Sequence, residues 1–261
     1  MSLDDKKLLE GRHIVVAACG SIAAVKTPLL VSSLVKLGAN VRCVITPSSA
    51  KLVSPLSLTN LSRNKCYQDE DQWSTNQAKP LHISLAEWAE VVVIAPLSAS
   101  TLGRWTQGIG EGLLASLLLA FEGPIIAAAA MNTGMWSNQF VLQNWKKLES
   151  NKQVLPLCPS KGLLACDRIG EGRMIDPIVI ELALKSVFIQ RKKHGELKRD
   201  FEGLKLIATA GPTIESLDPA RLITNRSSGR MGVLIAHAAK FRGADVELIH
   251  GPLGVPQPLL E

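Results

Sequence analysis

The stretch HIVVAACGSIAAVK, residues 13–26, decides the fold. Its first half is apolar at consecutive positions, which is typical of a strand buried on both faces of a parallel sheet. Gly20 and Ser21 then interrupt the apolar run, and a helical pattern follows over Ile22–Leu37. The stretch therefore predicts a strand, a tight turn and a helix, which form the first repeat of an α/β fold.

The same alternation continues along the chain. Further short apolar runs predict strands at VRCVITP (41–47), VVVIAP (91–96), PIIAAAAM (124–131) and QVLPLC (153–158). Helical patterns cover Ala99–Phe121, Gly134–Glu149 and Ile178–Val187. The sequence thus predicts a Rossmann-like, doubly wound parallel sheet over residues 1–190.

A second α/β series follows a charged stretch, residues 191–203, which we interpret as a linker. Over residues 204–261 it contains the strand LKLIATAG, a polar loop, the helix MGVLIAHAAKFRG and the strand DVELIHGP. Two strands and one helix do not close a domain. We therefore expect the chain to end inside this second domain, with residues 254–261 trailing without a partner.

Composition narrows the class of protein. The five cysteines have no CxxC pair, which argues against a disulfide framework and against a metal site, and favours the reducing cytoplasm. No apolar run is long enough to cross a membrane, so a soluble protein is expected. The formal net charge is +6, but the basic run near residue 191 is short, so we expect no nucleic-acid partner. A phosphorylated small molecule is a plausible use of the positive charge.

The carboxyl ends of the strands are where a doubly wound sheet binds its ligand. The first turn has the single glycine Gly20, and no acidic residue ends the second strand, so a dinucleotide is disfavoured. Ser21, Thr46, Ser48 and Ser49 follow strands where helices begin, and their hydroxyls could hold a monoester phosphate. The alternative is that Ser21 and Ser48 are only helix N-caps.

Further polar residues follow the later strands. Ser98, Ser100 and Thr101 end the third apolar run, and His82 precedes that run beside a short helical segment. A lone histidine is more often structural, but next to a phosphate or flavin pocket it could serve as an acid or base. Asn132 follows the fourth apolar run, beside Met131, and its amide can donate to a carboxylate.

The segment GLLACDRIGEGRM, residues 162–174, contains Cys166 in a run of glycines and charges. No strand or helix pattern is legible in it, so we expect a polar, mobile loop. Buried cysteines usually lie in apolar strands, which makes Cys166 unusual.

Four motifs together resemble the flavin-dependent cysteine decarboxylases, and within that family the decarboxylase half of the bifunctional flavoproteins of coenzyme A biosynthesis. They are GSIAAVK, HISLAEWAEVVVIAPLSAST, AAMNTGMW and GLLACDRIGEGRM. The segment ATAGPTIESLDPARLITNRSSGRMG resembles the start of the phosphopantothenate–cysteine ligase half. The resemblance covers residues 11–252.

The resemblance implies an enzyme with FMN as cofactor and a small phosphorylated thiol as substrate. Its reaction is the decarboxylation of 4′-phosphopantothenoylcysteine to 4′-phosphopantetheine, by thiol oxidation, loss of CO₂ and re-reduction of the enethiol. His82 is then the base that starts the oxidation, and Cys166 is the acid that completes the reduction under a closing flap. Asn132 and Met131 hold the substrate carboxylate. The implied FMN-binding residues are Gly20, Ser21, Thr46, Ser98 and Thr101.

Three positions need separate comment. Ser100 stands where the family has a substrate-binding asparagine, so either a water completes that contact or the contact is weakened. Arg173 could clamp a phosphate or carboxylate, or form a surface salt bridge. Arg230 replaces a usual lysine in the ligase half.

In the ligase half, Asn225, with Arg221 beside it, matches the residue that stabilises the acyl-cytidylate. CTP and Mg²⁺ would serve only a complete ligase domain, so ligase activity is not expected of this chain.

Several alternatives share the fold. A peptide-cysteine oxidative decarboxylase has no use for Cys166, and a flavin prenyltransferase has little use for Asn132. A non-catalytic or partial-site flavoprotein subunit would lose one of His82, Asn132 and Cys166, and all three are present. The resemblance also implies a homo-oligomer, a trimer or a multiple of trimers, with the flavin site between subunits.

Overall fold

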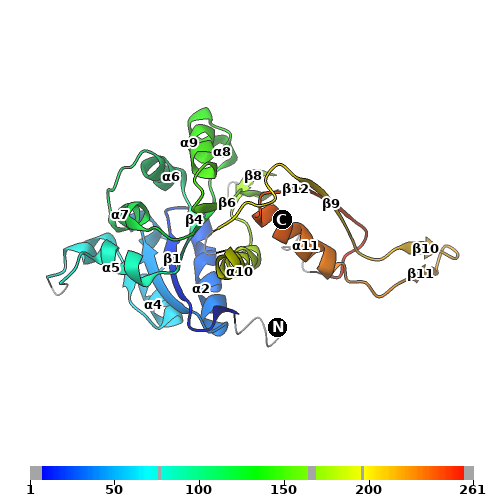
Figure 1. Cartoon of the computed structure of the whole chain (residues 1–261), viewed down its shortest axis with the longest axis horizontal. Coiled ribbons are helices and arrows are strands. Elements are labelled where there is room, and N and C mark those ends of the chain that lie inside the picture. Colours follow the sequence, from blue (N-terminus) through cyan, green and yellow to red (C-terminus); the bar gives the residue numbers. More distant parts are fainter. Residues whose placement is uncertain (1–7, 76–77, 164–168, 195–196, 256–261) are drawn as a thin grey trace. The chain divides into compact units, whose positions relative to one another are not determined.

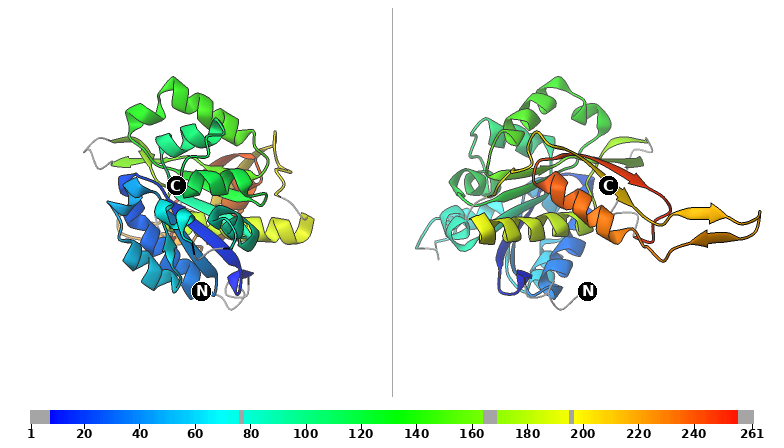
Figure 2. Two further views of the ribbon diagram at one scale, coloured as in Figure 1. Left: turned by 90° about the vertical axis from the view of Figure 1, so that its left-hand side faces the viewer. Right: turned by 45° about the vertical axis from the view of Figure 1, so that its right-hand side comes forward.

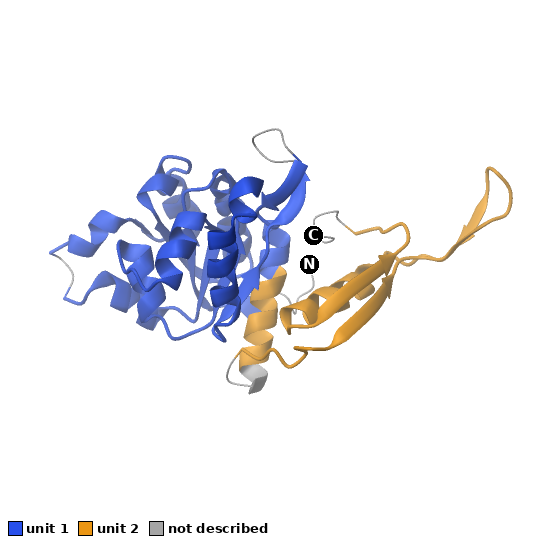
Figure 3. Cartoon of the chain, turned by 90° about the horizontal axis from the view of Figure 1, so that it is seen from above, with its two compact units in different colours: residues 1–181 blue, residues 182–261 orange. Residues whose placement is uncertain are grey.

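The computed structural model describes residues 8–75, 78–163, 169–194 and 197–255. The chain folds into two compact units, residues 1–181 and residues 182–261 (Figure 3). The boundary between these units falls inside one helix, α10 (Pro177–His194). The predicted domain bounds, 1–190 and 204–261, stay a prediction.

A six-stranded sheet forms the centre of the first unit (Figure 1), and all its strands are parallel. In spatial order they are β3 (Cys66–Tyr67), β2 (Asn40–Ile45), β1 (His13–Ala18), β4 (Val91–Leu97), β5 (Ile125–Ala129) and β6 (Val154–Leu157). The strand order reverses between β1 and β4, which is where a doubly wound sheet opens a crevice at its carboxyl edge. The predicted fold class is confirmed. The two-residue edge strand β3 was too short to predict.

Helices lie on both faces of this sheet (Figure 2). In chain order they are η1 (Ile22–Lys26), α2 (Thr27–Lys36), α3 (Pro47–Ala50), α4 (Pro55–Ser62), η2 (Asp69–Trp73), α5 (Leu81–Trp88), α6 (Ala99–Thr106), α7 (Leu113–Ala120), α8 (Thr133–Trp136), α9 (Gln139–Glu149) and α10. Within the described residues, none of the helices combines the length and the apolar character that a membrane span needs.

The core explains why the strands are apolar at every position. Val15, Ala17 and Cys19 of the β1 segment belong to one buried cluster, together with leucines of α5 and α7. Ile14 and Val16 are equally buried and point to the opposite face of β1, because side chains alternate along a strand. Burial on both faces produces the continuous apolar runs of the sequence.

Two predicted helices are each broken in two. The helix predicted over Ala99–Phe121 was wrong across residues 107–112, which separate α6 from α7. Gly108 (φ 72°) follows the end of α6 and Gly112 (φ 89°) precedes α7, and both adopt left-handed conformations. The pattern over Gly134–Glu149 was wrong near Asn138, which caps the start of α9 with its side chain. The predicted helix Ile178–Val187 is confirmed and extends further, as α10.

The expectation of a loop without strands at residues 162–174 was wrong. Strands β7 (Ser160–Leu163) and β8 (Ile169–Arg173) form an antiparallel hairpin. An alanine Cβ at Gly172 would lie less than 3.0 Å from the carbonyl oxygen of Met131, and one at Gly170 would overlap the hydroxyl of Thr133. The hairpin thus packs through its backbone, which removes the apolar pattern of an ordinary strand. Cys166 lies outside the described residues.

The second unit contains the predicted parallel pair, β9 (Lys205–Ala210) and β12 (Asp245–His250), with α11 (Arg230–Phe241) packed on it. The loop expected between β9 and α11 forms a short hairpin, β10 (Ile214–Ser216) and β11 (Leu222–Thr224). Residues 254–261 were expected to have no partner, and this was wrong for the first two. The N–H of Gly254 donates to the Ser228 carbonyl (3.1 Å), and Val255 is buried.

Candidate functional site

Two adjoining cavities lie at the carboxyl edge of the six-stranded sheet. The larger, about 540 Å³, is bounded by the ends of β1, β4 and β5 and by β8. The smaller, about 340 Å³, is bounded by the ends of β1, β2 and β4 and by the start of α7. Gly20, Ser98 and Ser100 line both cavities, which therefore meet at the switch point between β1 and β4.

The structure brings most of the predicted site residues of the first unit to these cavities. The larger cavity is lined by Ser21, Met131, Asn132 and Arg173. Thr46 and Thr101 line the smaller one. Together with the three shared residues, nine predicted positions meet in one place, although they are spread over more than 150 residues of sequence. Eight of them follow the ends of β1, β2, β4 and β5, and the ninth, Arg173, is the last residue of β8.

The turn after β1 must be glycine for steric reasons. An alanine Cβ at Gly20 would lie less than 3.0 Å from the Cβ of Ser48, closer than real Cβ atoms approach another atom. The two loops that frame the smaller cavity therefore touch at this point.

The strand-end hydroxyls are helix caps, as the simpler interpretation predicted for Ser21. The oxygen of Ser21 accepts the N–H of Ala23 (3.4 Å), and that of Ser98 accepts the N–H of Thr101 (3.3 Å). Thr46, and not Ser48, caps α3 by accepting from the N–H of residue 49 (3.3 Å). These caps orient helix-start N–H groups and hydroxyls toward the cavities, which suits an anionic ligand.

Ser49 follows the loop of the smaller cavity in sequence but lines neither cavity. Its hydroxyl oxygen is fully buried behind the cap at Thr46 and has no hydrogen-bond partner within the described structure. A buried polar group without a partner costs stability and is a common feature of functional regions. This orphaned hydroxyl lies directly beside the loop that frames the smaller cavity.

The larger cavity combines an apolar floor with polar groups at its rim. Met131 is buried, and its N–H donates to the Gly172 carbonyl (3.0 Å), which joins β8 to the end of β5. The Oδ1 of Asn132 accepts the N–H of Gly134 (2.8 Å), so the amide nitrogen is the end that suits a ligand carboxylate. Arg173 donates to the hydroxyl of Ser160 (3.3 Å) and is half-buried.

Lys26 is a cavity residue that the sequence did not single out. It lies at the end of η1, lines the larger cavity and forms an ion pair with Asp176 (3.8 Å). Two cations, Lys26 and Arg173, thus border one cavity. The sequence feature that could have indicated Lys26 is its position six residues after Gly20, on the short helix η1, whose first residues line the same cavity.

The far wall of the smaller cavity was also missed. It contains Asp69 of η2, Arg104 of α6 and Glu111 of the segment before α7. Neither Asp69 nor Glu111 follows one of the apolar runs from which the strand ends were predicted. Only their charge could therefore have marked them as candidate site residues.

The buried thiol of Cys19 lies directly before the glycine turn. Burial raises its pKa, and hydrogen bonds with Thr101 and Ser98 offset part of that rise. The thiol is therefore neutral at ordinary pH, and it links the end of β1 to the start of α6.

Among the described site residues that the family resemblance predicts for the first unit, His82 is the one that lines neither cavity. It lies within the first turn of α5, where the sequence had placed it just before the helix, and it is half-buried. Within the part of the chain that the structure describes, His82 lines neither the larger nor the smaller cavity.

The ligase-type residues lie on the hairpin of the second unit. Arg221 precedes β11 and bonds Asp218 through its guanidinium (2.6 Å), which holds the pKa of that carboxyl below its ordinary value. Asn225 follows β11, and its Oδ1 accepts the N–H of Ser227 (2.9 Å). Both side chains are exposed.

A parallel six-stranded sheet with capped helix starts and cavities at its switch point defines an α/β protein of the Rossmann-like type. A family model described as Flavoprotein matches residues 3–183, more than half of the chain. The chain therefore belongs to the flavoprotein family, which confirms the resemblance found in the sequence. A model described as the C-terminal domain of DNA/pantothenate metabolism flavoprotein matches residues 201–260.

Curated relatives and solved structures agree with this assignment. The coenzyme A biosynthesis bifunctional proteins CoaBC of Haemophilus influenzae and Bacillus subtilis are 42% and 37% identical over 96% of the chain, which spans 60% of each relative's length. A structure of a PPC decarboxylase mutant complexed with pantothenoylaminoethenethiol is 36% identical, with a TM-score of 0.63, over 67% of this chain and 97% of that one. The FMN binding protein AtHal3 is 37% identical, with a TM-score of 0.61, over 67% and 96%.

Proposed function

We propose that this chain is an FMN-dependent decarboxylase that converts 4′-phosphopantothenoylcysteine to 4′-phosphopantetheine in coenzyme A biosynthesis. The observation that carries the proposal is the meeting of nine predicted residues at two adjoining cavities of the switch point. The relatives support it, because they include CoaBC proteins, a PPC decarboxylase and an FMN binding protein.

The residues of the two cavities fit FMN. The capping hydroxyls of Thr46 and Ser98, the hydroxyl of Thr101 and the close turn at Gly20 suit a phosphate and a polyol chain. Bound FMN supplies the electron acceptor for oxidation of the substrate thiol.

The remaining cavity residues act on the substrate. Asn132 donates from its amide to the carboxylate and orients it for departure as CO₂. Lys26 and Arg173 attract the anionic groups of the substrate to the larger cavity. Ser100 offers one hydroxyl where the family has an amide, so its contact with the substrate is weaker or passes through water.

Two protons must move during the reaction. His82 takes a proton from the substrate thiol, and Cys166 returns one to the carbon that lost CO₂. Because His82 lines neither cavity of its own chain, we propose that a second copy supplies it in a homo-oligomer, a trimer or a multiple of trimers. The cysteines, which have no CxxC pair, support the cytoplasm as the compartment of this protein.

The second unit is proposed as part of a phosphopantothenate–cysteine ligase domain, because the model of the C-terminal domain of DNA/pantothenate metabolism flavoprotein matches residues 201–260. CTP and Mg²⁺ would act only with a complete ligase domain. The alternative for the first unit is a non-catalytic or partial-site flavoprotein subunit, which the weaker contact at Ser100 favours.

Anaerobic turnover of 4′-phosphopantothenoylcysteine tests the proposal, with CO₂ release and flavin absorbance followed together. The wild type is expected to form 4′-phosphopantetheine, whereas Cys166→Ala is expected to accumulate enethiol and bleached flavin. A wild type that binds FMN yet releases no CO₂ would favour the partial-site subunit. Restoration of turnover by Ser100→Asn would then identify Ser100 as the cause.

A further inference from the structure

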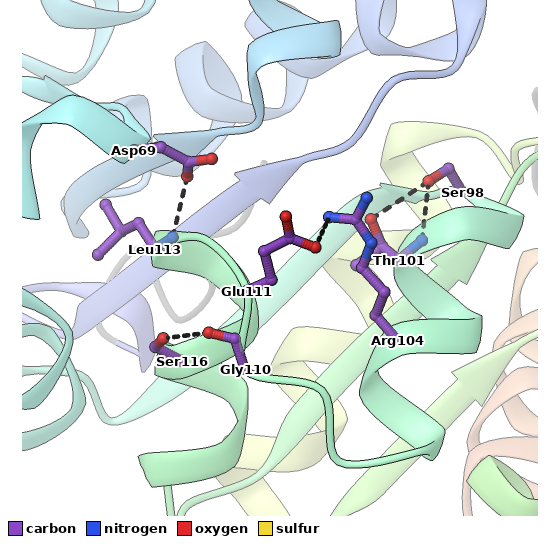
Figure 4. A network of polar contacts seen from close by, with 8 residues as sticks. All are labelled: Asp69, Ser98, Thr101, Arg104, Gly110, Glu111, Leu113 and Ser116. Atoms are coloured by element: carbon purple, nitrogen blue, oxygen red, sulfur yellow. Dashed lines mark hydrogen bonds and ion pairs between the residues drawn. The ribbon is translucent and has the colours of Figure 1, made fainter.

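The smaller cavity has two chemically opposite walls (Figure 4). One wall presents donors, namely the hydroxyl of Thr101 and the N–H groups at the start of α6. The other wall contains the carboxylates of Asp69 and Glu111 and the guanidinium of Arg104, so its formal charge is negative. A phosphate is repelled by the second wall and attracted by the first, so the cavity can distinguish the two ends of a phosphorylated ligand.

Asp69 is fixed in place by a contact with a distant segment. Its Oδ1 accepts the N–H of Leu113 (2.9 Å), the first residue of α7. The cap position of that helix is Gly112, which has no side chain to accept this N–H. An alanine Cβ at Gly112 would lie 2.9 Å from the Oδ2 of Asp69, so the glycine also makes room for the carboxylate.

The second oxygen of Asp69 is left to face the cavity. In Figure 4 it points away from Leu113, toward the side where Glu111 and Arg104 lie. Arg104 pairs with Glu111 (3.5 Å), and within the described part of the chain Asp69 has no ion-pair partner. A carboxylate oxygen only accepts hydrogen bonds, so the ligand group that meets it must be a donor.

We propose that Asp69 is a flavin-binding residue of this site: its second carboxylate oxygen accepts a hydrogen bond from a hydroxyl or ring N–H of the flavin. The inference rests on the proposed function. It adds an acidic residue to a set of contacts in which hydroxyls and backbone N–H groups had been the only candidates.

The test compares FMN with riboflavin, which has the same hydroxyls and ring N–H but no phosphate. The full chain is stripped of flavin and titrated with each, with flavin fluorescence as the readout, for the wild type, Asp69→Asn and Asp69→Ala. Asp71→Ala is the matched control: Asp71 also lies on η2 and accepts a backbone N–H (2.9 Å, from Gln68), but lines neither cavity. Thermal unfolding of each flavin-free variant is recorded in parallel.

We expect Asp69→Ala to weaken FMN and riboflavin by the same factor, about tenfold, because the lost hydrogen bond is to a charged acceptor and is common to both. Asp69→Asn keeps an oxygen for Leu113 and should unfold at the wild-type temperature, yet still weaken both flavins several-fold. Asp71→Ala should leave both affinities unchanged.

Wild-type affinities in Asp69→Asn would overturn the proposal and leave Asp69 as a helix cap alone. A loss for FMN without a loss for riboflavin would also overturn it, because Asp69 would then act at the phosphate end. A wild type that binds neither flavin would instead refute the proposed function itself.

Discussion

Replacement of Gly20 by alanine should disrupt the flavin site through a single steric contact. The new Cβ would lie less than 3.0 Å from the Cβ of Ser48, whereas non-bonded carbons prefer about 3.5–4.0 Å. The two loops must therefore separate by about 1 Å. Overpacking of this size costs about 1–3 kcal/mol in the free energy of unfolding. Because both residues line the smaller cavity, the Kd for FMN should rise about tenfold or more.

A double-mutant cycle isolates the contact. Ser48→Gly removes the Cβ that the alanine meets, so Gly20→Ala combined with Ser48→Gly should recover stability and FMN affinity relative to Gly20→Ala alone. The expected coupling is about 1 kcal/mol or more, which exceeds the usual error of additivity. Thermal unfolding and FMN fluorescence titration measure both quantities.

Gly103→Ala is the matched control. Its Cβ would lie 3.8 Å from the amide nitrogen of Asn144, an ordinary contact, within helix α6. Since alanine favours a helix, this variant should be as stable as the wild type or more stable. The steric reasoning is refuted if Gly20→Ala retains wild-type stability and FMN affinity, or if Ser48→Gly fails to recover what Gly20→Ala loses.

Gly172→Ala should destabilise the protein by about 2 kcal/mol more than Gly162→Ala, because position 172 combines φ 154° with a backbone overlap and position 162 has ordinary contacts; equal urea midpoints would contradict this. Burial raises the pKa values of the Cys43 and Cys66 thiols to about 12, so above pH 9 only the unfolded chain loses these protons. Stability should therefore fall between pH 9 and 12, by about 1.4 kcal/mol per pH unit for each thiol, and Cys43→Ala should show a shallower fall in urea titrations than the wild type. Thr27→Val should cost about 1–2 kcal/mol, because the buried hydroxyl donates to a β4 carbonyl (2.7 Å), and an unchanged urea midpoint would exclude a role for this bond.

The sheet was predictable because burial on both faces leaves a strong pattern. Each long strand is apolar throughout, as in β4, where all seven residues are buried. Residues 107–112 were not predictable by the same means, because the apolar period continues from α6 into α7 and only the left-handed glycines break it. The β7–β8 hairpin was missed for a related reason: its closest contacts are made by the backbone at Gly170 and Gly172, which leave no side-chain period.

The residues of the candidate site that follow strand ends were predictable from the sequence, and those on other elements were not. Ser98 follows β4 directly and Asn132 is the third residue after β5, so topology alone brings them to one edge. Asp69 reaches the same cavity from η2, and its only structural signature is a hydrogen bond to the N–H of Leu113, 44 residues away. A contact of that kind depends on tertiary packing and has no counterpart in local sequence.

Helix capping and ligand binding are compatible uses of the same hydroxyl. A serine or threonine hydroxyl has two acceptor lone pairs and one proton to donate. Capping uses a lone pair: Ser98 accepts the N–H of Thr101 (3.3 Å) and directs its own proton to the hydroxyl oxygen of Thr101 (3.2 Å). That bond occupies a lone pair of Thr101 and leaves its proton for a group in the smaller cavity. The cap thus fixes the direction of the next donor, and a serine at a strand end contributes to the ligand site because it is a cap.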